Sequence, residues 1–289
     1  MIIIDRAKKL IFLFLILIIL ISSVSVNAIS IQKKIISPPG LPNFYVNNDW
    51  KNLENGTIVI DEFIIDYIIG ENAFAKIQDA IDKASYHDLI FVFQGIYNEN
   101  ILIEENKEFV ELRGIYGWQD PDPMGENIIN GGSKKPIITI KSNYIKINGF
   151  IITNINNESD GIICESNYCK IYDNTFTKIG GIGVNLKSTT IGNKVYHNNF
   201  IENGQNAQDN SKTNNEAINS WYLEEQGNYW DDHPKGLKRN KYVWLKPYKI
   251  PGAAESVDIY PWIREDGKTK IKTNSLFTYY IKILKEMIK

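Results

Sequence analysis

The chain has 289 residues, of which 43% are hydrophobic and 23% are charged, and its formal net charge is −2. This hydrophobic content excludes a disordered chain. The near-neutral charge excludes the strong positive field with which nucleic-acid-binding proteins attract their partner. We therefore expect an ordered protein without a nucleic acid partner.

The N-terminus has the features of a targeting segment. Basic residues precede an apolar run over residues 10–21, and a stretch of small and polar residues ends at Ala28. The pattern predicts either a signal peptide over residues 1–28 or an uncleaved membrane anchor, because the uncharged sequence continues to Ile31. In both cases the rest of the chain lies outside the cytoplasm, secreted or at the cell surface.

A linker and a helix are expected next. Prolines and a glycine within residues 29–42 break any regular element. Asn72 is a suitable N-cap for a helix over residues 73–84, whose apolar residues recur on one face.

A repeat of about 24 residues occupies the middle of the chain. It places Ile147, Ile171 and Val195 at equivalent positions and Asn174 over Asn198. A unit of this size cannot bury a core alone, so successive units must stack. Three short strands and three turns fit one unit, which predicts the coil of a parallel β-helix, wound right-handed like other parallel crossovers.

Two segments follow the repeats. Residues 205–215 are polar and poor in apolar side chains, which predicts an exposed loop. Residues 275–289 form an amphipathic pattern with lysines on the polar face, which predicts a C-terminal helix. That helix is too short and too basic to span a bilayer. It is expected to dock on the β-helix, to bind a partner helix or to lie on a membrane surface.

Both ends of the repeat region resemble a known family. Residues 72–84, followed by residues 90–100, look like the opening of pectin-lyase-like β-helix proteins, many of which are secreted archaeal proteins with NosD-like repeats. Residues 227–232 and 258–262 resemble the closing segment of that family. The resemblance covers residues 43–263 and implies a right-handed parallel β-helix outside the cytoplasm. It does not fix an activity, because the fold hosts lyases, hydrolases, adhesins and passive surface proteins.

These observations predict an all-β chain with appended ends. Its parts are the signal peptide or anchor, the linker, a right-handed parallel β-helix over residues 43–263 with caps at both ends, and a basic linker with a short helix over residues 264–289. The amphipathic helix over residues 73–84 is expected to cover the first coil, which would otherwise expose its core.

Signs of catalysis are weak. Asp160, followed by a glycine, resembles the first catalytic stretch of β-helix polygalacturonases, but those enzymes need further carboxylates on adjacent coils. The next coil has Gly183–Val184 at this place, without an acid. A turn built by Asp160 explains the motif without chemistry, so no catalytic residue is expected.

A weak metal site is the alternative role of the closing segment. Asp231, Asp232 and His233 form the best local cluster of ligands, and Asp258 joins them if this segment folds back. The competing interpretation is that Trp230 and its neighbours cap the last coil while the acids face water. We expect no cofactor.

Three kinds of modification or contact are predicted for an exported chain. Cys164 and Cys169 are candidates for a disulfide, and Asn55 and Asn157 stand in glycosylation triplets. The aromatic residues available for stacking on a sugar are Trp118, Trp221 and Tyr222.

The sequence therefore favours a non-catalytic β-helix protein outside the cytoplasm with a structural or binding role. A cell-surface glycan or an envelope protein is the expected partner, and an uncleaved N-terminal segment would add the membrane. Two alternatives stay open: a polysaccharide lyase or glycoside hydrolase, and an accessory protein for metal delivery of the NosD type.

Overall fold

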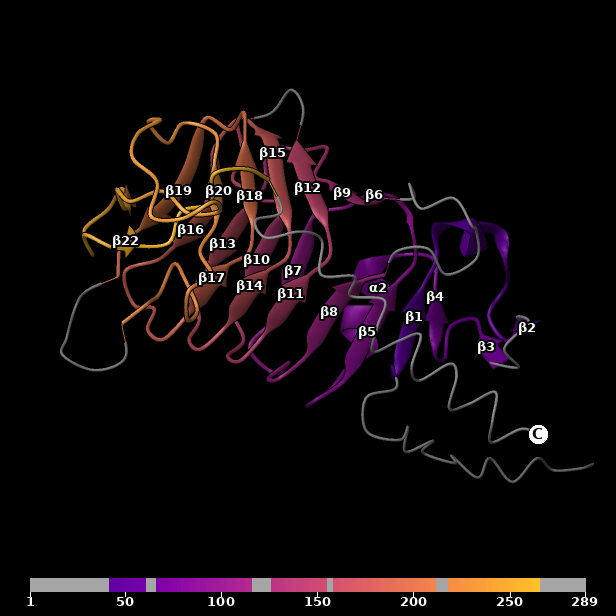
Figure 1. The fold of residues 1–289 in the computed structure, drawn as a ribbon. Helices are drawn as coiled ribbons and strands as arrows, with labels where there is room; N and C mark the ends of the chain where they lie inside the picture. The colour runs from indigo at the N-terminus through magenta and orange to yellow at the C-terminus, as the bar shows by residue number, and fades with distance from the viewer. Residues whose placement is uncertain (1–41, 61–65, 116–125, 155–157, 212–217, 266–289) are drawn as a thin grey trace, which may run out of the picture. The chain divides into compact units, whose positions relative to one another are not determined.

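Among the described residues, 18 of the 22 strands belong to three parallel sheets (Figure 1). The computed structural model describes residues 42–60, 66–115, 126–154, 158–211 and 218–265. The chain divides between Pro38 and Pro39, and all described residues belong to the second unit.

Each sheet takes its strands from successive coils. The seven-stranded sheet has the order β17 (Lys194–Tyr196), β14 (Lys170–Tyr172), β11 (Lys146–Asn148), β8 (Glu111–Gly114), β5 (Leu89–Val92), β1 (Phe44–Val46), β4 (Ala73–Phe74). The six-stranded sheet has the order β20 (Tyr229–Trp230), β18 (Asn199–Ile201), β15 (Thr175–Ile179), β12 (Ile151–Asn154), β9 (Asn127–Asn130), β6 (Gly95–Asn98). The five-stranded sheet has the order β19 (Gln205–Asp209), β16 (Ile182–Leu186), β13 (Ile162–Cys164), β10 (Ile138–Ile140), β7 (Ile101–Ile103).

Short antiparallel pairs lie outside these sheets. They are β2 (Ile58–Ile60) with β3 (Asp66–Ile68), and β21 (Tyr248–Lys249) with β22 (Val257–Asp258). The helical elements of the described residues are η1 (Asn48–Asn52) and α2 (Ile77–Lys83).

The register confirms the 24-residue repeat. Ile147 pairs with Ile171, and Ile171 pairs with Val195. All three side chains are buried, because residues alternate between the two faces of a strand and this set faces inward. Three stacked parallel sheets built in this way are the architecture of a parallel β-helix, as expected.

Aromatic rings stack inside the last coils. Phe176 lies on Phe200 at 5.0 Å, Phe200 on Trp230 at 4.4 Å, and Trp230 on Tyr248 at 4.1 Å between ring centroids. Tyr248 belongs to β21, which follows the last strand of the six-stranded sheet, β20. The chain after β20 therefore folds back and covers the outer face of the Trp230 ring.

The N-terminal helix differs from the prediction. It begins at Ile77 rather than residue 73, and Asn72 is not its N-cap, because Asn72 Oδ1 accepts the N–H of Ile68. Glu99, from the first coil, instead accepts the N–H groups of Ile77 and Gln78. A carboxylate there satisfies free N–H groups at the positive end of the helix.

Residues 205–209 also differ from the prediction. They form strand β19 rather than an exposed loop. β19 pairs with β16 in parallel, and its inward side chains are Ala207 and Asp209. The small and the acidic inward residue explain why the segment lacks the apolar signal of a strand.

Several predicted features lie outside the described residues. They are the N-terminal segment, most of the linker, Trp118, Asn157 and the C-terminal helix. None of the helices that the structure describes has the length and apolar character needed to cross a membrane.

Candidate functional site

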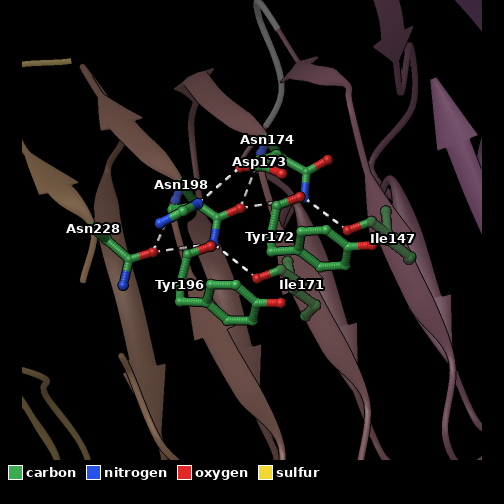
Figure 2. A network of polar contacts seen from close by, with 9 residues as sticks. Ile147, Ile171, Tyr172, Asp173, Asn174, Tyr196, Asn198 and Asn228 are labelled. Atoms are coloured by element: carbon green, nitrogen blue, oxygen red, sulfur yellow. Dashed lines mark hydrogen bonds and ion pairs between the residues drawn. The ribbon is translucent and has the colours of Figure 1, made fainter. Parts of the chain in front are cut away.

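A row of buried asparagines joins the turns of consecutive coils (Figure 2). Asn198 Oδ1 accepts the backbone N–H of Asn174 at 3.1 Å, and Asn228 Oδ1 accepts that of Asn198 at 3.0 Å. The side-chain amides donate in turn to the carbonyls of Ile147, Ile171 and Val195. The predicted alignment of Asn174 with Asn198 is therefore confirmed, and the row satisfies backbone groups that would otherwise be buried without partners.

The row ends at Asp258. Its Oδ2 accepts the backbone N–H of Asn228 at 2.7 Å and the indole N–H of Trp230 at 2.9 Å, and its Oδ1 accepts the N–H of Tyr260. Asp258 is fully buried. Burial raises the pKa of Asp258 to about 6, although these donors act in the opposite direction.

A second row ends in the same way. Asn193 Oδ1 accepts the N–H of Cys169, and Asn219 Oδ1 accepts that of Asn193. Asn219 then donates to Asp209, which also accepts the indole N–H of Trp221 at 3.2 Å. Sequence reasoning missed Asp209, because its segment was interpreted as a loop.

The four metal-ligand candidates do not converge. Asp231 and Asp232 are exposed and both accept Asn206 Nδ2, at 3.0 and 2.9 Å. His233 Nε2 contacts the carbonyl of Lys246, and its ring stacks on Trp244. Asp258 belongs to the asparagine row. Among the described residues no group of three or more His, Cys, Asp and Glu side chains could hold a metal ion.

Cys164 and Cys169 are both buried thiols in the structure. Ser166 lies between them, with its Oγ at 3.6 Å from Cys164 Sγ and 3.3 Å from Cys169 Sγ. Burial raises the pKa of Cys169 well above that of an ordinary thiol. Sulfurs that share one hydroxyl are near neighbours, and oxidation of the pair to a disulfide stays a prediction.

The side chain of Asp160 joins two consecutive coils. Its Oδ1 accepts the N–H of Ile182 and its Oδ2 accepts the side-chain amide of Asn185, both at 2.9 Å. Both carboxylate oxygens therefore bind the next coil.

The described aromatic candidates for sugar stacking are occupied by protein contacts. Trp221 is fully buried, and the ring of Tyr222 meets Tyr260 edge-on at 5.4 Å. The exposed Asn55 keeps its place as a glycosylation candidate.

A row of rings on the turns offers no free faces either. His87, Phe109, Tyr144 and Tyr168 stack at 4.3–5.2 Å, each with a positive φ. The next turn has Gly192, against which the ring of Tyr168 lies. Because sugars stack on ring faces, this row is a coil-to-coil contact rather than a sugar platform.

The outer face of the seven-stranded sheet carries a column of charged residues. The register aligns Glu111, Lys146, Lys170 and Lys194 on consecutive strands. Lys146 Nζ lies 3.3 Å from Glu111, and Arg113 also pairs with that carboxylate. Burial raises the pKa of Glu111, but the two cations outweigh it and lower the pKa overall. The 24-residue repeat also aligns the three lysines in the sequence, but charged residues on a strand give no sign of a site by themselves, since most of them only face solvent.

A column of polar and aromatic residues runs beside the charged one. It consists of Arg113, Asn148, Tyr172 and Tyr196. The rings of Tyr172 and Tyr196 are parallel, with centroids 5.2 Å apart (Figure 2). Burial raises the pKa of both phenols, for Tyr196 to about 12, so both carry their proton at neutral pH.

Comparison with known proteins assigns the family. The sequence profile of a family described as "Periplasmic copper-binding protein (NosD)" matches residues 87–236, which is more than half of the chain. The chain belongs to the NosD family. This agrees with the resemblance seen in its end motifs and with the three parallel sheets.

A relative from an archaeon is also similar to this NosD-family chain. A protein named "Cell surface glycoprotein" from Methanothermus fervidus is 40% identical over 106 residues. The match covers 35% of this chain and 15% of the glycoprotein, so the chain spans a small part of that relative. Both descriptions agree with a location outside the cytoplasm.

The described residues do not fit a copper centre. Copper carriers use clusters of Cys, Met or His. The buried thiols of Cys164 and Cys169 have no histidine among their contacts. His197 pairs with Asp173 at 3.1 Å. All three methionines lie outside the described residues.

Proposed function

We propose that this NosD-family chain is a non-catalytic module of the cell envelope, exported through its N-terminal segment and built to be a rigid scaffold. In this proposal the coil winds right-handed, helix α2 covers the first coil and the closing segment covers the last. The C-terminal residues attach the module to a neighbour in the envelope.

The observation that carries the proposal is the use made of the buried polar side chains. Asn174, Asn198 and Asn228 bind backbone groups of adjacent coils, and Asp258 ends their row. Asp160, which resembles a catalytic acid in sequence, has both oxygens bound to the next coil. An acid that is fully engaged in this way is poorly placed to exchange protons with a substrate.

Labelling of intact cells tests the location. A membrane-impermeant, amine-reactive reagent should label the full chain in intact cells, while a cytoplasmic protein of the same cells stays unlabelled. If the chain is labelled only after lysis, the envelope proposal is wrong.

An assay with polysaccharides tests the absence of catalysis. The full chain, incubated with polyuronides and with envelope glycans, should release no sugar with or without calcium. Turnover that disappears in Asp160→Asn would overturn the scaffold proposal in favour of an enzyme.

A further inference from the structure

The lysine column of the seven-stranded sheet is incompletely neutralised. Neighbouring strands lie about 4.8 Å apart, so aligned lysines on β11, β14 and β17 repeat at that interval. Within the described residues one carboxylate, that of Glu111, forms an ion pair with this column. Its partner is Lys146, the first lysine of the column. Lys170 and Lys194 make no ion pair and no side-chain hydrogen bond in the part of the chain that the structure describes.

Adjacent positive charges raise the free energy of the folded chain unless something offsets them. Asp173, the acid that follows Tyr172, pairs with His197 Nδ1 at 3.1 Å. The repeat thus preserves a line of cations without supplying the acids that would neutralise them.

The surroundings of these lysines offer hydrogen-bond donors. Tyr172 and Tyr196 stand beside Lys170 and Lys194 on the same strands, and both phenols carry their proton at neutral pH. Tyr172 directs its hydroxyl toward Glu111 at 3.5 Å, and that of Tyr196 has no partner among the described residues. A surface with cations and O–H donors suits a ligand that carries negative charge and acceptor oxygens.

Both ends of the column are bounded by the protein. Toward the N-terminus the outer side of the sheet is covered by a second apolar cluster that includes Trp50, Tyr67 and Phe91, and Arg113 lies over the ring of Phe91. Toward the C-terminus the backbone of Lys194 forms a β-bridge with Ser220. Two residues after Ser220, the ring of Tyr222 packs against that of Tyr260. These half-buried lysines therefore form a line across consecutive coils, between two covered ends.

We propose that this line, Lys146, Lys170 and Lys194 with Tyr172 and Tyr196, binds an acidic polysaccharide of the cell envelope. A regular row of cations complements a polymer whose carboxylate or sulfate groups recur at regular intervals, and an extended glycan advances by roughly one coil spacing per sugar ring. The C-terminal residues 266–289 are unsuited to this site, because lysines outnumber acids there and the charges would repel. The inference goes beyond the scaffold role.

Binding of purified full chain to defined polymers tests the inference. The probes are polygalacturonate, which carries carboxylates, dextran sulfate, neutral dextran, and single-stranded oligothymidylate as a nucleic acid. We expect the acidic glycans to bind, neutral dextran not to bind, and the affinity to fall as salt is raised, since salt screens exposed charges.

Three double variants distinguish binding at this lysine column from a general effect of protein charge. Lys170→Gln with Lys194→Gln should weaken the binding of the preferred acidic glycan at least about tenfold, on the scale of one lost charge-assisted hydrogen bond. The matched control, Lys178→Gln with Lys187→Gln, removes one lysine from β15 and one that directly follows β16, both outside the seven-stranded sheet. It should leave the affinity within about twofold. Lys170→Arg with Lys194→Arg should retain binding, because it keeps both charges.

Stability supplies an independent readout. The melting temperature of Lys170→Gln with Lys194→Gln should equal or exceed that of the wild type at low salt, because a repulsion is removed. That result also excludes misfolding as the cause of lost binding. The inference is overturned if both glutamine variants bind alike, if no acidic glycan binds, or if the oligothymidylate binds more tightly than either acidic glycan.

Discussion

Asp258 accepts the backbone N–H of Asn228 at 2.7 Å and so takes the place that one more asparagine would hold in a further coil. An asparagine there would present an N–H₂ group that needs an acceptor, and the last coil has no following turn to supply one. A carboxylate only accepts. Asp258 therefore ends the row, because its carboxylate accepts hydrogen bonds from Asn228, Trp230 and Tyr260 and has no N–H group that needs an acceptor.

The pH dependence of stability follows from this buried carboxyl. Its pKa is raised from 3.8 to about 6, so between these values the folded chain holds a proton that the unfolded chain has lost. The free energy of unfolding therefore falls as pH rises through this window and levels off above it. A shift of about two pKa units corresponds to about 3 kcal/mol. Thermal unfolding between pH 4 and about 7 measures the effect.

Asp258→Asn is the control for that measurement. The amide cannot ionise, so this variant should lose the part of the pH dependence that Asp258 causes, and its stability curve should be flatter between about pH 4 and 6. If wild type and variant show parallel curves over this range, another group carries the dependence.

The asparagine row predicts a large effect of Asn198→Leu. Asn198 is fully buried, its Oδ1 accepts two bonds from Asn174, and its amide donates to the carbonyls of Ile171 and Tyr196. Leucine leaves these groups without partners, at about 1–3 kcal/mol for each buried group. We expect a loss of at least about 3 kcal/mol in the free energy of unfolding, measured by denaturant titration.

Asn52→Leu is the matched control for the row. Asn52 is exposed at the end of η1, so the same substitution should change the free energy of unfolding by no more than about 0.5 kcal/mol. Equal losses in the two variants would refute a special role for the buried row.

The sequence predicted the inward side of the coils because strand pairing follows the repeat. Residues separated by 24 positions face the same way, so the alignment of Ile147 with Ile171 in sequence is also their pairing in space. The same rule does not predict Glu111, the ion-pair partner of Lys146. Glu111 lies 35 residues before it, because a longer coil separates the two strands, and a fixed period therefore points to the wrong residue.

The closing segment shows a second limit of sequence reasoning. Asp258 lies 30 residues after Asn228, outside any repeat, and in sequence it resembled a metal ligand beside Asp231 and Asp232. Only the fold shows that it faces inward to Trp230 while the other two acids face outward to Asn206.

Oxidation of Cys164 and Cys169 is the prediction for the exported chain. An oxidoreductase of the envelope would remove two electrons and two protons from the pair, and the intact mass without reductant should be lower by two hydrogens. Closing so short a loop should stabilise the chain by about 2 kcal/mol. The melting temperature should therefore fall on reduction in the wild type but not in Cys164→Ala. An unchanged mass after reduction would show that the pair remains as thiols.

The closing segment gives the last prediction, which separates a cap from a metal site. Trp230 is buried between Phe200 and Tyr248 and donates to Asp258. Trp230→Ala leaves a cavity at the end of the core and should cost roughly 3–5 kcal/mol, with aggregation through the uncovered coil. Asp231→Asn with Asp232→Asn changes two exposed residues and should cost less than about 1 kcal/mol. Chelator should leave the melting temperature of the wild type unchanged. A melting temperature that falls with chelator and recovers with calcium or copper would refute the cap, because the cap is held by ring stacking and hydrogen bonds alone.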